Sequence, residues 1–194
     1  MTDLRARLLG ALARPGETST DHDLNPDIHL PPNRVLRPAA VLIAVTPDAR
    51  VILTKRSSRL KHHPGQIAFP GGKRDECDAD LGACALREAE EEIGLPRDRV
   101  DMLGSLPPHE TVTSFLVTPH VALIEPGFTP VPEAGEVDEV FDVPLSHVAD
   151  PASFRIEGRR WRGRRRRYYA VPWGPYYIWG ATARMLRALA DRMS

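Results

Sequence analysis

Four glutamates fall within five consecutive positions of the chain, at Glu88, Glu90, Glu91 and Glu92. In a helix, Glu88, Glu91 and Glu92 share one face because they are three and four residues apart. Carboxylates at these spacings repel one another by about 0.2–0.5 kcal/mol per pair. The face is therefore either solvated, with Arg87 pairing to Glu91 one turn on, or occupied by a cation. An acidic helix alone is more often solvated, so the surrounding residues must decide.

An apolar stripe lies next to the acidic face of the same helix. The 3.6-residue period brings together Ala85, Leu86, Ala89 and Ile93. Carboxylates that border a packed stripe lose part of their hydration, which raises the cost of leaving them unpaired. A divalent cation removes that cost, and carboxylate oxygens on one rigid face suit Mg²⁺ or Mn²⁺.

The elements that must position this helix can be read from apolar runs and turn residues. Asp78 or Asp80 is the expected N-cap of the acidic helix, which ends near Gly94. Strands are expected at 39–45, 51–57, 67–69, 100–106, 114–124 and 136–145, with a hairpin over 154–161 and 164–173. Further helices are expected at 4–15 and 177–193, and residues 15–38 are expected to be irregular. The first two strands should form a buried hairpin, and Gly71 and Gly72 should end the third strand in a turn. This order predicts an α/β protein with a mixed sheet between helices.

Composition limits the class of protein. The chain has 194 residues, which suits one domain with a real core. It carries 26 basic and 26 acidic residues, so its zero net charge argues against binding to nucleic acid or membranes through overall charge. Cys77 and Cys84 fit neither a disulfide framework nor a zinc site, which indicates a reducing, cytoplasmic location. No apolar run approaches the roughly 20 residues that span a bilayer.

The glycine pair and the acidic helix together resemble the signature of the Nudix hydrolases, which is a glycine, an acid and then R-E-apolar-x-E-E-x-G-apolar. The matching residues are Arg87, Glu88, Ala89, Glu91, Glu92, Gly94 and Leu95. Fourteen residues lie between Gly72 and Arg87, where the common signature has one fewer, and the acid six positions after Gly72 is Asp78. The resemblance implies a Nudix α/β/α sandwich with a mixed central sheet and a loop-helix-loop catalytic motif. It places the Nudix domain at 36–194, after an N-terminal helix and an irregular lead-in over 1–35.

A longer segment resembles the coenzyme A diphosphatase branch of that family. The stretch "LTKRSSRLKHHPGQIAFPGG" at 53–72 is similar to the L-T-x-R-S and G-Q-I-A-F-P-G-G segment of that branch, and "EVFDVPL" and "IWGATARML" are similar to later pieces. The resemblance implies metal-dependent hydrolysis of coenzyme A or acyl-CoA to 3′,5′-ADP and 4′-phosphopantetheine or its acyl form. Two alternatives stay open: a Nudix hydrolase for ADP-ribose or a dinucleotide, and a non-catalytic domain that binds nucleotide or RNA.

The resemblance also assigns roles to individual residues. Glu88 and Glu92 are the first candidates as ligands of Mg²⁺ or Mn²⁺, and Glu91 is the third. Arg87 resembles the family arginine that holds a glutamate in its ligating orientation. The general base is one of the helix glutamates or a loop acid such as Glu136 or Glu139. Substrate contacts are expected from Arg56, Ser57, Gly71 and Gly72. The expected partner is a small molecule, coenzyme A or a derivative, with no nucleic acid and no membrane, and a homodimer is compatible with the sequence.

A second charged segment, at 155–167, holds eight arginines in "RIEGRRWRGRRRR". Arginine binds phosphate with paired donors, so the segment could contact the 3′-phosphate of coenzyme A. A solvated hairpin tip explains the arginines at least as well. RNA binding is a third interpretation, because Trp161, Tyr168 and Tyr169 lie among the basic residues.

Overall fold

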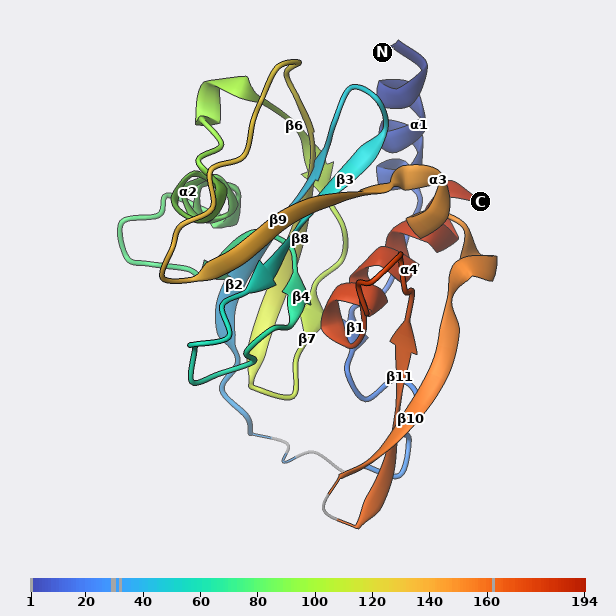
Figure 1. Cartoon of the computed structure of the whole chain (residues 1–194). Helices are drawn as coiled ribbons and strands as arrows, with labels where there is room; N and C mark the ends of the chain where they lie inside the picture. Colours follow the sequence, from blue (N-terminus) through green and yellow to red (C-terminus); the bar gives the residue numbers. More distant parts are fainter. Residues whose placement is uncertain (1, 29–30, 32, 162) are drawn as a thin grey trace.

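The computed structural model describes residues 2–28, 31, 33–161 and 163–194, and the chain is organised around one sheet of nine strands (Figure 1). The strands are β1 (Ser19–Thr20), β2 (Arg37–Val45), β3 (Arg50–Arg56), β4 (Ile67–Ala68), β5 (Gly71–Lys73), β6 (Val100–Ser105), β7 (His109–Glu110), β8 (Phe115–Ile124) and β9 (Val137–Pro144). They pair in the order β1-β7-β8-β2-β3-β4, with β5 beside β2, β6 beside β8 and β9 beside β3. Because β2 and β8 are parallel while β6 and β9 are antiparallel to their neighbours, the sheet is mixed, as the sequence predicts.

Helices cover both faces of this sheet (Figure 1). They are α1 (Thr2–Ala13), α2 (Leu81–Ile93), α3 (Leu145–Val148) and α4 (Ala181–Met193), with 3-10 turns at Arg97–Arg99 and Pro151–Ser153. α2 packs on one face, over a core that includes Leu42 and Ile52. α1, α3 and α4 pack on the other face, over a core that includes Ile43 and Leu53. The expected α/β/α sandwich is therefore confirmed. In the part of the chain that the structure describes, no helix is long and apolar enough to cross a membrane.

β2 and β3 form the expected hairpin, but they pair only near its closed end, where Val45 lies opposite Val51. Farther from the turn the two strands separate, and the segment that carries β4 and β5 lies between them. β4 pairs with β3, whereas β5 pairs with β2. The expected turn at Gly71 and Gly72 is therefore wrong, because both residues belong to an extended strand against β2.

α2 begins and ends at residues that the sequence predicts. Asp80 is its N-cap, and the Asp80 carboxylate accepts a hydrogen bond from the backbone amide three residues on, at 2.8 Å. Gly94 ends the helix with a φ of 67°, the left-handed conformation that glycine adopts without a steric penalty. α4, in contrast, begins at Ala181 and not at 177. The residues before it run alongside β11 (Arg164–Ala170), and the Val171 amide donates to the Ile178 carbonyl at 2.9 Å.

β11 and β10 (Arg155–Trp161) form the expected second hairpin, as a separate two-stranded sheet. Its register sets arginines against arginines: Arg159 lies opposite Arg166 and Arg160 opposite Arg165. Like charges directly opposite one another destabilise a strand pair. The hairpin is therefore unfavourable on charge alone, and other interactions must hold it.

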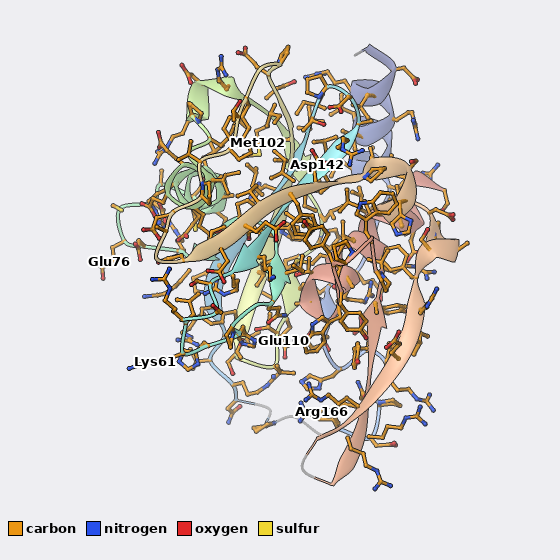
Figure 2. All side chains as sticks on the ribbon, viewed as in Figure 1. Lys61, Glu76, Met102, Glu110, Asp142 and Arg166 are labelled. Atoms are coloured by element: carbon orange, nitrogen blue, oxygen red, sulfur yellow. The ribbon has the colours of Figure 1, made fainter. Side chains whose placement is uncertain are left out.

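The hairpin lies on the α4 side of the main sheet, whereas α2 lies on the other side (Figure 1). Figure 2 shows Arg166 on the hairpin far across the molecule from Glu76, which precedes α2. Contact between the hairpin and the 3′-phosphate of a substrate bound at α2 stays a prediction, and this arrangement does not favour it. Arg162, one of the eight arginines, lies outside the described residues.

In the N-terminal part of the chain, α1 and the residues around β1 pack against the body of the protein. Leu8 of α1 is fully buried, and α1 contacts α4 and β6. After α1, β1 pairs in parallel with β7, and His109 hydrogen-bonds both Ser19 at 2.9 Å and Asp21 at 3.1 Å. These two-residue strands were not expected, because a pair of residues carries no periodic pattern.

Candidate active site

Arg87, in the middle of α2, donates hydrogen bonds to three carboxylates at once. Its Nε and Nη2 donate to the two oxygens of Asp78, both at 2.9 Å. Its Nη1 donates to Glu88 at 2.9 Å and to Glu91 at 3.0 Å, and Nη2 also donates to the Lys73 carbonyl at 3.2 Å. The contact with Glu88 is of the kind that the sequence predicts for Arg87. The contact with Glu91 is the one expected of a solvated helix, so one side chain makes both expected contacts, and the role of Arg87 toward a metal ligand stays a prediction.

Asp78 is buried in the loop before α2 and anchors Arg87. The hydrogen bonds from Arg87 hold the pKa of Asp78 well below its ordinary value of 3.8. The Asp75 amide donates to Asp78 at 2.8 Å, so the loop turns back on itself. This turn keeps Asp78 within reach of Arg87 although the loop is one residue longer than the common signature. The sequence signature predicts an acid at the position of Asp78, and the structure shows that Arg87 is the partner of this acid.

Gly71 and Gly72 bring the backbone of β5 against the glutamates of α2. A Cβ on Gly72 would lie 2.5 Å from the Glu88 carboxyl carbon, and a Cβ on Gly71 would lie 2.5 Å from the Ala40 carbonyl oxygen. The Gly71 amide also donates to Oε2 of Glu92 at 3.3 Å. The glycines are therefore needed for close approach and not for a turn. Their contact with substrate stays a prediction.

Glu92 is the most buried glutamate of the helix, with 6% of its side chain exposed. Burial raises the pKa of Glu92 to about 8, and burial also raises the pKa of Glu88. The negative charge of Glu136 acts in the same direction on both carboxyls. Nη1 of Arg56 lies 4.0 Å from Oε1 of Glu92, which is a weak ion pair. Glu88 and Glu92 thus place two carboxylates one helical turn apart in a partly desolvated region, and a bound cation would neutralise their negative charges.

These donors suit a hard divalent cation that needs few protein ligands. Glu88 and Glu92 supply carboxylates from one rigid helix. The side chain of Glu91, the third predicted ligand, is 59% exposed and its carboxylate contacts Arg87. Among the residues that the structure describes, no three His, Cys, Asp or Glu side chains are grouped so that they could hold a metal ion. Mg²⁺ commonly binds through one or two carboxylates together with waters and substrate phosphates, so buried Glu92 and half-buried Glu88 fit it.

The two polar side chains that were expected to contact substrate lie in different surroundings. The Arg56 side chain, at the end of β3, is 28% exposed and faces Glu92. Ser57 is fully buried, and its amide donates to the Glu136 carbonyl at 2.8 Å. Ser57 thereby fixes the loop that carries Glu136. A direct contact of Ser57 with substrate stays a prediction, and it would require this loop to move.

The two loop acids that were considered as general base face different parts of the molecule. Glu139 accepts a hydrogen bond from the Tyr176 hydroxyl, and Tyr176 stacks on Phe141 with 3.6 Å between ring centroids. Tyr176 and Phe141 pack against the core on the side of α4. Glu136 is exposed, and its charge acts on the carboxyls of Glu88 and Glu92 in α2. The structure therefore brings Glu136, and not Glu139, close to the helix glutamates.

The fold and the site together define a class of protein: an α/β/α sandwich in which one helix presents a buried and a half-buried carboxylate beside the strand that contains Gly71 and Gly72. The family model described as the NUDIX domain matches residues 35–162. The chain therefore belongs to the Nudix hydrolase family, and it is an enzyme that hydrolyses phosphoric anhydrides. Nudix hydrolases generally depend on a divalent metal, which agrees with the partly desolvated carboxylates of Glu88 and Glu92.

Curated relatives carry the same family name. The chain is 42% identical over 156 residues to the uncharacterized Nudix hydrolase NudL of Cronobacter sakazakii, a match that covers 79% of this chain and 81% of that protein. It is 39% identical over 183 residues to the uncharacterized Nudix hydrolase NudL of Klebsiella pneumoniae, covering 88% and 95%. Among solved structures, the MutT protein from Methanosarcina mazei Go1 is similar with 21% identity and a TM-score of 0.49, over 60% of this chain and 82% of that one.

Proposed function

We propose that this chain hydrolyses the diphosphate of coenzyme A or acyl-CoA, with Mg²⁺ or Mn²⁺, to 3′,5′-ADP and 4′-phosphopantetheine or its acyl form. The observation that carries the proposal is the position of residues 53–72, whose sequence resembles the coenzyme A diphosphatase branch. This segment runs through β3, β4 and β5 and forms the wall beside Glu92. Arg56 and the Gly71 amide both face the Glu92 carboxylate from it.

The residues of segment 53–72 and of α2 would have separate roles in hydrolysis. Glu88 and Glu92 would hold the cation, and Arg87 keeps Glu88 oriented. A bound divalent cation neutralises phosphate oxygens and lowers the pKa of a water ligand, so that hydroxide is available near neutral pH. Arg56 would pair with diphosphate oxygens through its guanidinium. Glu136, exposed beside the carboxylates, is the acid that we assign to accept the proton of the attacking water.

The alternatives differ in what they require of these residues. A Nudix hydrolase for ADP-ribose or a dinucleotide would use the same glutamates, so α2 does not distinguish it. The preference for coenzyme A rests on residues 53–72. A non-catalytic binding domain has no need for a buried and a half-buried carboxylate one turn apart, which argues against it.

Product analysis tests the proposal. The purified protein is incubated separately with coenzyme A, ADP-ribose and a capped RNA, with and without Mg²⁺, and the products are identified by mass spectrometry. Formation of 3′,5′-ADP together with 4′-phosphopantetheine, only when Mg²⁺ is present, is the expected result. Cleavage of ADP-ribose without cleavage of coenzyme A would overturn the substrate and keep the Nudix chemistry. Binding of these compounds without cleavage of any would indicate the non-catalytic alternative.

A further inference from the structure

A hollow of about 640 Å³ lies between the arginine hairpin and the N-terminal part of the chain, on the α4 side of the main sheet. One wall consists of Arg165 and Arg167 of β11. The other consists of Leu24, Asn25, Pro26, Asp27 and Ile28. The volume is within the roughly 300–1,000 Å³ that is typical of small-molecule sites. None of these residues has a part in the hydrolysis proposed above.

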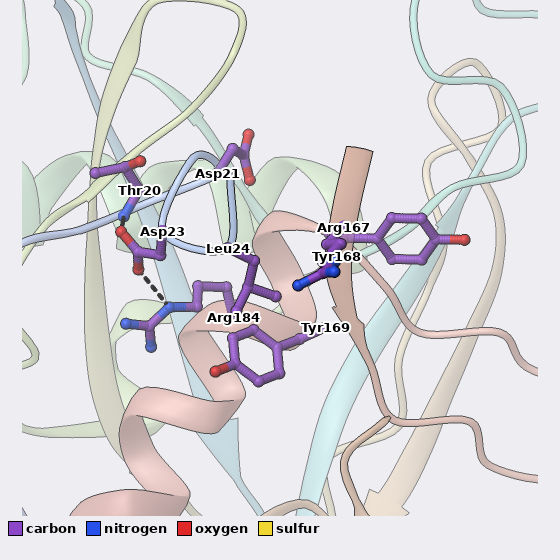
Figure 3. Close-up of a pocket in the computed structure, with 9 residues that line it drawn as sticks. Thr20, Asp21, Asp23, Leu24, Arg167, Tyr168, Tyr169 and Arg184 are labelled. Carbon is purple, nitrogen blue, oxygen red and sulfur yellow. Dashed lines mark hydrogen bonds and ion pairs between the residues drawn. The ribbon is translucent and has the colours of Figure 1, made fainter. Parts of the chain in front are cut away.

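The wall opposite the arginines belongs to an N-terminal strap, defined here as residues 19–28, which is fastened to the body. The buried Asn25 side chain accepts a hydrogen bond from the Arg167 amide at 2.8 Å and donates to the Arg167 carbonyl at 2.9 Å. Asp23 pairs with Arg184 of α4 at 2.7 Å. Figure 3 shows the ion pair between Asp23 of the strap and Arg184 as a dashed line. The strap therefore holds a fixed position relative to the backbone of β11.

Arg165 and Arg167 project from the same face of β11, because alternate residues of a strand share a face. Gly158 of β10 lies opposite Arg167. The Arg165 side chain crosses this glycine, since a Cβ on Gly158 would lie 2.7 Å from Nε of Arg165. The missing side chain at Gly158 thus gives Arg165 room to lie beside Arg167 over the same hollow.

The positive charge of the hairpin is not neutralised within the described part of the protein. No carboxylate lies within 4.0 Å of the guanidinium nitrogens of Arg155, Arg159, Arg160, Arg165, Arg166 or Arg167 among the described side chains. Glu157, the acid of the hairpin, instead accepts a hydrogen bond from Tyr177 at 2.5 Å. Asp27 lines the hollow but forms no ion pair with the two arginines across it. An anion bound between Arg165 and Arg167 would offset the repulsion between them.

We propose that this hollow binds a small organic phosphate of nucleotide size. The planar guanidinium groups of Arg165 and Arg167 match the oxygens of a phosphate group through paired donors. The apolar side of the strap, formed by Leu24, Pro26 and Ile28, receives the less polar part of the ligand. A cationic wall facing an apolar wall favours an organic phosphate over inorganic phosphate, which has no apolar part. The site is independent of the proposed hydrolysis, because it uses none of the residues of α2.

Equilibrium binding of ADP to the full chain, measured by calorimetry in buffer that contains EDTA and no divalent metal, tests the site. The test variant is Arg165→Ala with Arg167→Ala. Its matched control is Arg159→Ala with Arg166→Ala, a pair on the opposite face of the same hairpin that removes the same charge. We expect the Kd for ADP to rise by about tenfold or more in the test variant and by less than about threefold in the control. Equal losses in both variants, or no binding of ADP to the wild type, would overturn the proposal.

A further variant separates geometry from charge. Gly158→Ala keeps every arginine but places a Cβ where the Arg165 side chain lies. It should therefore weaken ADP binding by about threefold or more. Unchanged binding would contradict the placement of Arg165 beside Arg167. Adenosine, which lacks phosphate, should bind far more weakly than ADP. Pyrophosphate bound as tightly as ADP would show that the apolar wall has no role. A single-stranded RNA that binds more tightly, with a salt dependence that reports more than two phosphate contacts, would replace the small-ligand site with a polymer surface.

Discussion

The carboxylate of Glu88 occupies the space that a side chain on Gly72 would need, since a Cβ there would lie 2.5 Å from both the carboxyl carbon and Oε1 of Glu88. Glu88 cannot move away freely, because it also accepts a hydrogen bond from Arg87 at 2.9 Å. The backbone of β5 and a predicted metal ligand on α2 therefore fix one another.

Gly72→Ala is accordingly expected to lower kcat by about a hundredfold or more, because a displacement of about 1 Å in a positioned group has that effect. The measurement is steady-state kinetics on the substrate found by product analysis, with a thermal melt to show that the fold persists. Gly10→Ala in α1 is the control, since nothing lies within 4 Å of its new Cβ, and it should keep full activity. Unchanged kcat in Gly72→Ala would show that Glu88 needs no fixed position.

The helix glutamates should differ sharply in their effect on turnover. Glu88→Gln and Glu92→Gln are expected to cut kcat by several orders of magnitude while the fold persists, because each removes a proposed ligand of the cation that generates the nucleophile. Glu90→Gln is the matched control: its carboxylate pairs with Arg97 at 2.8 Å, away from the site, and its loss should change kcat little. A Glu90→Gln variant as impaired as Glu88→Gln would contradict the assignment of faces on α2.

Asp78 should stabilise the protein in a way that depends on pH. Asp78→Asn replaces a buried charged partner of Arg87, so the free energy of unfolding should fall by about 1.5–3 kcal/mol near neutral pH. Because the pKa of Asp78 is lowered in the folded state, its contribution is fully present above its ordinary pKa of 3.8 and is lost as the pH falls through the lowered folded value. Urea unfolding of both proteins should therefore show a constant difference above about pH 5 and a shrinking one below about pH 4. A difference that does not change with pH would mean that the ion pair is not its source.

The elements with a long periodic signal could be predicted from the sequence, and those without one could not. α2 was expected from its N-cap to its C-terminal glycine because Asp80 and Gly94 each have a local chemical reason to end a helix. The strand at Gly71–Lys73 was missed, because glycine favours turns by its own preference while its use here depends on Ala40 and Glu88, which are distant in sequence. Local preference was overridden by a tertiary contact.

The candidate site shows the same division. The spacing of the glutamates predicts that Glu88, Glu91 and Glu92 share a face, and in the structure Glu88 and Glu91 both accept hydrogen bonds from Arg87. The spacing cannot predict how deeply each is buried, so the difference between buried Glu92 and exposed Glu91 emerges only from packing against β2 and β5. Nor does spacing reveal that Glu139 accepts a hydrogen bond from Tyr176, which comes from a loop far along the chain.

Substrate preference provides the last prediction, and it tests residues 53–72 as a unit. If this segment makes the site selective for coenzyme A, kcat/KM for coenzyme A should exceed that for ADP-ribose and for dinucleotides when all are assayed in parallel with the same metal ion. Arg56→Ala should reduce kcat/KM for coenzyme A by about tenfold or more, since a charged hydrogen bond contributes about 1.5–3 kcal/mol. Arg59→Ala, a loop arginine for which the described residues show no contact with the helix glutamates, is the control and should reduce it less. A higher kcat/KM for ADP-ribose would contradict the assignment to coenzyme A, while the roles of Glu88 and Glu92 would stand.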